Sequence, residues 1–266
     1  MRKFLINTLK VVAILYIAIC VFLFFFQENL IFHPQKLAKN FKFEFERKFE
    51  ELNIKTEEKI TLNGLLFKAD SSKGLIFYLH GNSGSLKGYG NIAKHYNSRH
   101  YDIFMVDYRG FGKSDGDING GEEQVFKDIQ TVYDTLKLRY NENKIVVIGY
   151  SIGTGPATKL AATNNPKQLI LQAPYFSLID MMKHEYPGIP TFILNYKFQT
   201  NKYICECKMP VTIFHGDKDE VIYYNSSVQL RALCKAADKL ITLSGSGHNG
   251  INENPGYLKE LDVILK

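Results

Sequence analysis

Five consecutive residues, 149–153, read G-Y-S-I-G and place a serine hydroxyl between two glycines. An apolar run at 145–148 (IVVI) precedes them, and a helical pattern follows over 152–164. On a sharp turn from strand to helix, the hydroxyl of Ser151 would stand clear of the sheet, and the flanking glycines would let neighbouring backbone approach closely. The sequence therefore predicts that Ser151 is a nucleophile.

A dinucleotide-binding loop is the main alternative for this turn, because Gly153-Thr154-Gly155 also follows the apolar run. The third glycine of that fingerprint would fall at Thr158, and no acidic residue follows about twenty residues later beside a strand end. Cys205 and Cys207 are separated by a single residue and have no second pair, which does not fit a zinc knuckle. We expect neither a cofactor nor a metal ion.

A serine nucleophile needs a base to accept its proton. Residues 245–249 (GSGHN) follow an apolar run at 240–243 and carry His248 in a glycine-flanked loop near the C-terminus. His80 and His215 precede glycines at strand ends, where bracing a loop is the simpler role. We therefore predict that His248 is the base for Ser151.

The base in turn needs an orienting acid. Residues 215–219 (HGDKD) offer Asp217 and Asp219, and sequence spacing alone does not separate them. We prefer Asp219, because Asp217 is placed to cap the loop, as turn aspartates often do. The chain order Ser151, Asp219, His248 is the order nucleophile, acid, base expected after such a turn.

Acyl transfer also needs two hydrogen-bond donors for the oxyanion of the tetrahedral intermediate. The backbone N–H of Ile152, directly after the nucleophile, is one candidate. Residues 80–84 (HGNSG) follow an apolar run at 74–79, and the N–H of Asn82 is the second candidate. A plain glycine-rich turn is the alternative for this segment.

The elements that would position these residues alternate between strand and helix. Segments 51–55 and 59–68 resemble a hairpin, and unbroken apolar runs follow that suit strands buried on both faces. Between them lie helical patterns, of which 254–265 has Asn254 as N-cap. This alternation predicts an α/β fold with a mostly parallel sheet and helices on both faces. The remaining predicted strands and helices lie at 74–79, 103–106, 145–148, 169–171, 211–214, 240–243, 121–140, 152–164 and 225–237.

Two regions lie outside this alternation. Residues 176–209 are rich in methionine and aromatic residues and are too long for a simple connection, so we expect a small lid. Residues 4–26 are almost uniformly apolar, which favours a transmembrane helix over a cleaved signal peptide because the run ends in bulky phenylalanines. The expected organisation is an anchor at 1–28, a linker at 29–50 and a hydrolase domain at 51–266.

The distribution of charge bears on two questions: the orientation of the protein in a membrane and binding to nucleic acid. Arg2, Lys3 and Lys10 supply half of the net charge of +6, and basic and acidic residues mix along the rest of the chain, so we expect no nucleic-acid partner. Basic residues before the apolar segment predict a single-pass protein with a cytoplasmic N-terminus and an external domain, although Lys36, Lys39 and Lys42 near its other end weaken this inference. The four cysteines are expected to be unpaired thiols, and the alternative is a disulfide between Cys234 and either Cys205 or Cys207 in an oxidising compartment.

With these motifs in place, residues 50–266 resemble the α/β-hydrolase superfamily. Residues 107–114 (DYRGFGKS) are similar to a D-x-R-G-x-G-x-S segment that follows the fourth strand in many members. Residues 27–34 (QENLIFHP) resemble the segment after the anchor in membrane-anchored, short-lid members of the serine aminopeptidase-like branch, which also includes protein-depalmitoylating relatives.

The sequence thus predicts hydrolysis of a carboxylester or thioester, in a small-molecule or acylated substrate, through an acyl-serine intermediate. The apolar lid suits a hydrophobic acyl group, although ordinary packing explains the same residues equally well. An aminopeptidase is the alternative enzyme, and it would use a lid acid such as Asp180, Glu185 or Glu206 to hold the substrate's amino end. A membrane-tethered interaction module without activity is the alternative outside enzymology.

Overall fold

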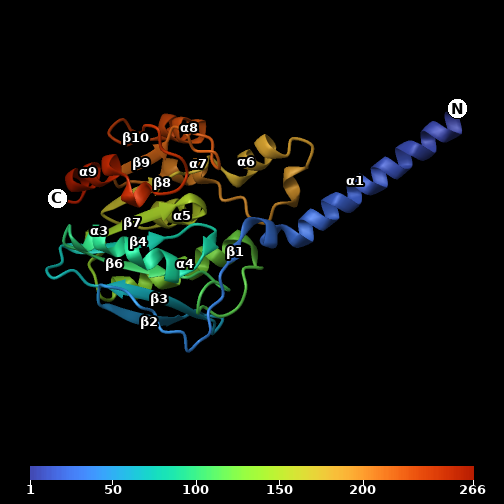
Figure 1. Ribbon diagram of the computed structural model, residues 1–266. Coiled ribbons are helices and arrows are strands. Elements are labelled where there is room, and N and C mark those ends of the chain that lie inside the picture. Colours follow the sequence, from blue (N-terminus) through green and yellow to red (C-terminus); the bar gives the residue numbers. More distant parts are fainter.

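A computed structural model describes all residues of the chain, from Met1 to Lys266. Its centre is an eight-stranded sheet with the strand order β10-β9-β8-β7-β4-β6-β3-β2 (Figure 1). Neighbouring strands are parallel, except that β3 is antiparallel to β2 and to β6. The strands are β2 (Phe49–Lys55), β3 (Thr61–Phe67), β4 (Gly74–Leu79), β6 (Tyr101–Val106), β7 (Ile145–Tyr150), β8 (Gln168–Gln172), β9 (Val211–Gly216) and β10 (Lys239–Leu243).

The central strands are buried on both faces, which explains why they are unbroken apolar runs. In β4, Leu75, Phe77 and Leu79 face one apolar cluster, whereas Ile76 and Tyr78 face another on the opposite side of the sheet. Strands with a hydrophobic cluster on each face need helices on both sides to exclude water. The predicted fold class, an α/β sheet covered on both faces, is confirmed.

Helices cover the two faces of the sheet. α4 (Gly121–Lys137), α5 (Thr154–Thr163) and α8 (Asn225–Leu233) contribute to the larger cluster, and α3 (Ala93–Asn97) and α9 (Pro255–Ile264) contribute to the smaller one. α4 buries Val125, Ile129, Val132, Tyr133 and Leu136, the stripe expected of a helix with one apolar face. As predicted, Asn254 caps α9, its side chain accepting hydrogen bonds from the N–H groups of Gly256 and Tyr257.

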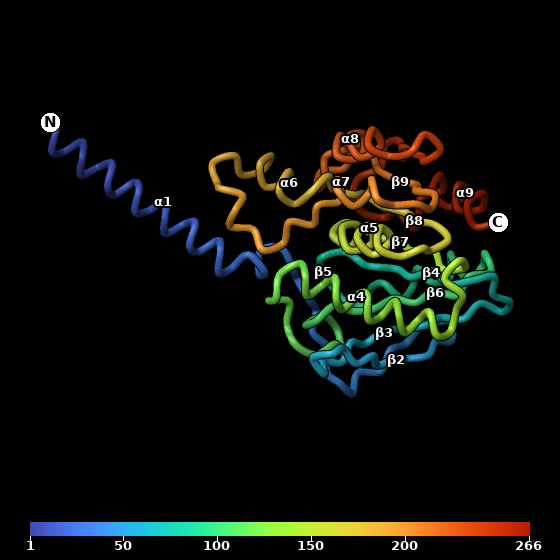
Figure 2. The backbone as a smooth tube through the Cα atoms, turned by 180° about the vertical axis from the view of Figure 1, so that it is seen from behind, coloured from blue at the N-terminus to red at the C-terminus, as the bar shows by residue number.

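A helix of 30 residues, α1 (Arg2–Ile31), precedes the domain and projects away from it (Figures 1 and 2). Its most apolar window has a mean hydropathy of 2.8, and none of that window is buried against the protein. Gln27 is the only residue of α1 that is buried. The helix is long and apolar enough to span a bilayer, although a signal sequence has the same properties.

The segment between α1 and β2 is packed against the domain. The short strand β1 (His33–Pro34) pairs in parallel with β5 (Ser83–Gly84), a two-residue strand outside the main sheet. Farther along, Lys36 bridges to Gly112, and Phe32 and Phe43 are buried. Residues 32–43 therefore follow a fixed path along the domain.

The lid expected at 176–209 contains α6 (Leu178–Glu185), a loop with one 3₁₀ turn (Thr191–Ile193), α7 (Thr200–Tyr203) and a second 3₁₀ turn (Ile204–Glu206). Tyr196 and Phe198 are buried in the larger cluster, so these two aromatic residues serve ordinary packing. Tyr186 and Phe192 instead lie on the surface, with 63% and 83% of their area exposed. α6 and the loop after it lie on the same side of the domain as α1 in both views (Figures 1 and 2). All four cysteines are free thiols. The remaining α-helix is α2 (Leu86–Tyr89).

Candidate active site

Ser151 lies at the turn between β7 and α5, where a single 3₁₀ turn, Ser151–Gly153, joins strand to helix. Its φ of +52° is in the left-handed region, which side chains with a Cβ rarely adopt. Strain of this kind persists only where the surrounding structure enforces it, and it is concentrated at functional sites. The predicted sharp turn is therefore present.

Both glycines of the motif are required by close backbone contacts. A Cβ on Gly153 would lie 2.3 Å from the carbonyl oxygen of Leu79 and 2.7 Å from that of His80. A Cβ on Gly149 would lie 2.6 Å from the carbonyl oxygen of Gly153. The turn can therefore press against the loop after β4 only because these positions lack side chains.

The structure brings Ser151, His248 and Asp219 together, although 97 and 29 residues separate the contacting pairs. Ser151 Oγ and His248 Nε2 are 3.0 Å apart, and His248 Nδ1 lies 2.7 Å from Asp219 Oδ2. Since a carboxylate only accepts hydrogen bonds, Nδ1 carries the proton and Nε2 is free to accept the hydrogen of the serine hydroxyl. This tautomer is the one that general-base catalysis by His248 requires.

The carboxylate of Asp219 has no exposed surface and is fully hydrogen-bonded. Oδ1 accepts hydrogen bonds from the N–H groups of Val221 and Ile222, each at 2.8 Å. Oδ2 accepts hydrogen bonds from both His248 and His215. Burial by itself would raise the pKa of Asp219, but the hydrogen bonds from His215, His248 and Ile222 outweigh burial and hold the pKa well below its ordinary value. Asp219 therefore stays ionised beside the imidazole.

Asp217, the alternative acid, lies elsewhere. Its Oδ1 accepts a hydrogen bond from the N–H of Gly245 at 2.7 Å, and its side chain makes no contact with His248. It thereby ties the loop after β9 to the loop after β10. The same two loops meet where a Cβ on Gly216 would lie 2.2 Å from the carbonyl oxygen of Ser246.

Sequence reasoning missed the role of His215, which it assigned only to bracing a loop. The buried ring places Nε2 3.1 Å from Asp219 Oδ2 and 2.9 Å from the carbonyl oxygen of Ile222, while Nδ1 lies 2.6 Å from Ser227 Oγ. With two acceptors beside Nε2, that nitrogen carries the proton and donates, and the hydroxyl of Ser227 donates to Nδ1. His215 therefore holds the same carboxylate oxygen, Oδ2, that His248 contacts. The i, i+4 spacing of His215 and Asp219 was the available signal.

Tyr150, the variable residue before Ser151, is a second residue that the motif did not reveal. Its ring lies beside that of His248, with centroids 5.5 Å apart, and its hydroxyl lies 3.3 Å from the carbonyl oxygen of His248 and 3.0 Å from Asn249 Oδ1. Burial is the main reason that the pKa of the Tyr150 hydroxyl is raised, which keeps it a donor. Tyr150 thus fixes the loop that carries the imidazole.

The two predicted oxyanion donors lie on adjacent loops. Strands β4 and β7 pair so that Leu79 is opposite Gly149, and Asn82 and Ile152 each come three residues later. Among the backbone hydrogen bonds of turns and loops, none has the N–H of Asn82 as its donor. The pairing of β4 with β7 thus keeps the two loops that carry the predicted donors next to each other.

The loop that carries Asn82 is held by the segment that follows α1. The side-chain amide of Asn82 donates to the carbonyl oxygen of Ile31 at 2.7 Å, and the N–H of His33 donates to the carbonyl oxygen of Asn82 at 2.8 Å. Ser85 Oγ also donates to Gln35 Oε1 at 3.0 Å. No local sequence signal indicates these contacts.

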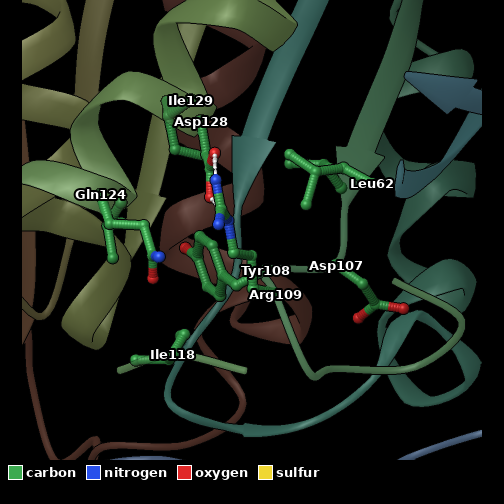
Figure 3. Close-up of a pocket in the computed structure, with 10 residues that line it drawn as sticks. Leu62, Asp107, Tyr108, Arg109, Ile118, Gln124, Asp128 and Ile129 are labelled. Carbon is green, nitrogen blue, oxygen red and sulfur yellow. Dashed lines mark hydrogen bonds and ion pairs between the residues drawn. The ribbon is translucent and has the colours of Figure 1, made fainter. Parts of the chain in front are cut away.

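The D-x-R-G-x-G-x-S segment, residues 107–114, contacts the loop after β4 and helix α4. Asp107 is buried, accepts a hydrogen bond from the N–H of Leu86, and lies 3.4 Å from His80 Nε2. Gly112 has a φ of +49°, and a Cβ there would overlap the Asp107 carboxylate. Arg109 reaches the opposite way and binds Asp128 of α4 through two parallel hydrogen bonds of 2.6 and 2.8 Å (Figure 3). The cavity of about 10 Å³ beside this pair has room for at most one water and does not adjoin Ser151.

Comparison with known proteins agrees with this architecture. A family model described as serine aminopeptidase, S33, matches residues 70–204, which make up half of the chain and include the turn at Ser151. The chain belongs to this family. The chain is 29% identical to the protein bem46 of Schizosaccharomyces pombe, over 92% of this chain and 87% of that protein.

This chain is also similar to the α/β-hydrolase domain-containing protein aho-3 of Caenorhabditis elegans. It is 29% identical over 62% of this chain, which spans only 48% of that relative's length. Among solved structures, an esterase of Pyrococcus furiosus aligns with a TM-score of 0.68 at 18% identity, covering 88% of this chain and 95% of the esterase. The resemblance predicted from the sequence is confirmed: the chain is a serine aminopeptidase S33 family member with the α/β-hydrolase fold.

Proposed function

We propose that this protein is a membrane-anchored serine hydrolase that cleaves a carboxylester or thioester through an acyl-Ser151 intermediate. The observation that carries the proposal is the pair of hydrogen bonds from Ser151 to His248 and from His248 to Asp219, at 3.0 and 2.7 Å. A hydroxyl, an imidazole of the correct tautomer and an ionised carboxylate in this order form the machinery of nucleophilic acyl transfer.

In the acylation half-reaction, His248 Nε2 takes the hydroxyl proton while Ser151 Oγ attacks the carbonyl carbon of the substrate. The negative charge that develops on the carbonyl oxygen is stabilised by the N–H groups of Asn82 and Ile152. As the intermediate collapses, the bond to the leaving group breaks and the imidazolium gives its proton to the departing alkoxide or thiolate. Asp219 stays ionised throughout and stabilises the imidazolium.

In the deacylation half-reaction, a water molecule replaces the leaving group. His248 takes a proton from this water, and the resulting hydroxide attacks the acyl carbon of the ester on Ser151. The same two N–H groups stabilise the second oxyanion. Collapse releases the carboxylic acid product and returns the proton from His248 to Ser151 Oγ, so the protein ends the cycle unchanged.

An ester or thioester is favoured over an amide because the lid acids of α6 already have partners. Asp180 accepts a hydrogen bond from the hydroxyl of Tyr223, and Glu185 contacts the neighbouring His184 at 2.9 Å. An aminopeptidase needs an acid free to hold the ammonium group of its substrate. The family's description names this activity, so aminopeptidase remains the alternative, with Glu206 as its free acid.

Membrane attachment is the second part of the proposal. It is supported by the length of α1, its mean hydropathy of 2.8 and the complete exposure of its apolar window. Arg2 and Lys3 before the apolar stretch favour a cytoplasmic N-terminus and an external domain. Protease added to intact cells should then digest the domain, and protection of the domain until the cells are lysed would reverse the orientation.

A fluorophosphonate probe tests the catalytic part. The probe should label the full-length protein, whereas Ser151→Ala should remain folded and unlabelled. Ser83→Ala is a matched control, because Ser83 lies exposed on the neighbouring loop, and it should be labelled normally. A well-folded protein that the probe does not label would instead support an interaction module without activity.

A substrate comparison separates the two enzymatic candidates. We expect turnover of p-nitrophenyl esters of graded chain length, with little turnover of aminoacyl anilides. A preference for the anilides, reduced by Glu206→Gln, would replace the esterase proposal with an aminopeptidase.

A further inference from the structure

We propose that the lid loop, residues 186–194, lies in the lipid bilayer beside α1 and forms a second membrane contact. This inference depends on the membrane attachment proposed above. The loop has the sequence Y-P-G-I-P-T-F-I-L and contains no charged residue. It lies between the charged end of α6 and Asn195.

Two contacts fix this loop along the anchor helix. The hydroxyl of Tyr16 donates a hydrogen bond to the carbonyl oxygen of Gly188 at 2.8 Å. Eleven residues farther along α1, the amide of Gln27 donates to the carbonyl oxygen of Ile193 at 3.1 Å and accepts from the N–H of Asn195 at 2.8 Å. At the rise of an α-helix, the loop follows the anchor for about 16 Å.

That distance places the loop at membrane depth if α1 spans the bilayer. Residues 11–26 of α1 carry no charge, and Tyr16 lies within this stretch. The hydrocarbon core of a bilayer is about 30 Å thick, so a loop held from Gln27 to Tyr16 would occupy about half of that thickness. The bilayer that covers α1 would therefore also cover the loop.

The chemistry of the loop suits that position. Phe192 is 83% exposed and Tyr186 is 63% exposed, although neither has a protein partner that would explain an exposed aromatic side chain. Pro187 and Pro190 carry no N–H group, and the carbonyl oxygens of Gly188 and Ile193 are hydrogen-bonded by α1. Within the loop, the N–H groups of Ile189, Ile193 and Leu194 donate to backbone carbonyl oxygens, so these backbone groups find partners in the protein, as a segment in lipid requires.

The charged residues before the loop have a partner on the protein or can reach water. The ring of His184 stacks on that of Tyr223, with centroids 4.7 Å apart, and Glu185 pairs with His184. Lys183 is exposed, and its long side chain can extend to the headgroups. His184 and Glu185, which directly precede the loop, therefore already have partners on the protein.

Tryptophan fluorescence can test this arrangement directly, because the chain contains no tryptophan. The full-length Phe192→Trp variant would be reconstituted into phosphatidylcholine vesicles, with or without lipids brominated near the head of the acyl chain. Leu15→Trp reports on the anchor, and Leu138→Trp, at a position that is 87% exposed on the hydrolase domain, reports on water. Each variant must keep the thermal midpoint of the parent protein.

We expect blue-shifted emission from Phe192→Trp and roughly two-fold quenching by the brominated lipid, as for an aromatic residue at a membrane interface. Leu138→Trp should be unaffected. Quenching of Leu15→Trp without quenching of Phe192→Trp would overturn the loop contact and leave the anchor in place, whereas quenching of neither would reject membrane attachment itself. Blue-shifted emission from Phe192→Trp without quenching would show that protein, including a second copy of the chain, covers the loop instead.

Discussion

The side-chain amide of Asn82 donates a hydrogen bond to the backbone carbonyl of Ile31 at 2.7 Å. Ile31 is the last residue of α1, and Asn82 carries one of the two N–H groups proposed to stabilise the oxyanion. The parallel pairing of β1 with β5 continues this contact over the next two residues. The end of the N-terminal helix therefore helps to determine the position of the loop that carries this proposed donor.

Removal of that contact should affect turnover more than substrate binding. Asn82→Ala keeps the backbone donor but loses the hydrogen bond to Ile31, and we expect kcat to fall roughly three- to ten-fold, as for the loss of one hydrogen bond. KM should change little, because the donor acts chiefly in the transition state. Ester hydrolysis by Asn82→Ala and by the neighbouring control Ser83→Ala would test this. A raised KM with unchanged kcat would assign the loop to substrate binding.

The choice between the two aspartates can be tested by isosteric substitution. Asp219→Asn removes the charge that orients His248, and kcat should fall by on the order of 10³- to 10⁴-fold. Asp217→Asn can still accept the hydrogen bond from Gly245 and should leave kcat nearly unchanged. A comparable loss in both variants, measured with the same ester, would contradict the assignment of Asp219.

The lowered pKa of Asp219 also predicts how its contribution to stability depends on pH. Because the folded-state pKa lies below that of the unfolded chain, the ionised group stabilises the fold above the ordinary carboxyl value and loses this effect as pH falls through the folded value. Asp219→Asn should therefore melt below the wild type by a constant margin from about pH 8 to about pH 5, and the margin should shrink below about pH 4. Thermal melts of the two proteins across this range would measure it. A margin that already shrinks at neutral pH would point to another group.

The second glycine of the serine motif should be intolerant of a methyl group. The Cβ of Gly153→Ala would meet the carbonyl oxygens of Leu79 and His80, so the turn and the loop carrying Asn82 would be forced apart. A displacement of about 1 Å in a catalytic group commonly reduces the rate by on the order of 10²-fold. Gly88→Ala is the control, because a Cβ there would meet nothing within 4 Å. Equal activity of the two variants in ester hydrolysis would show that the contact can relax.

The buried pair of Arg109 and Asp128 should matter for stability. Arg109→Met leaves the Asp128 carboxylate buried without its cation, and the free energy of unfolding should fall by about 3–5 kcal/mol. The double variant with Asp128→Leu should recover part of this loss, because it removes the unpaired charge. Arg139→Met breaks an exposed pair with Glu50 and should cost less than about 1 kcal/mol. Urea titrations of the full chain in detergent would compare the three, and an equal loss in both single variants would contradict this account.

The sequence alone was sufficient wherever the structural signal is local. The turn at Ser151 was predictable because an apolar strand, two glycines and a helix adjoin one another, and the structure places a φ of +52° at that residue. The strands were predictable because burial on both faces leaves an unbroken apolar run, as in Gly74–Leu79. The predicted helices differ from the structure in where they end: the helix expected at 121–140 ends at Lys137, and that expected at 225–237 ends at Leu233.

Only the tertiary structure decided which side chains meet. Asp217 and Asp219 share one loop and the same local pattern, and the direction of each side chain relative to the loop after β10 determines that Asp219 contacts His248 while Asp217 contacts Gly245. The bond from Asn82 to Ile31 likewise left no local pattern, whereas the contact of His215 with Asp219 left an i, i+4 spacing. The physical reason is that a polar contact across 30 to 50 residues depends on the register of the sheet and the path of the chain, whereas burial and turn geometry are imposed on neighbouring residues.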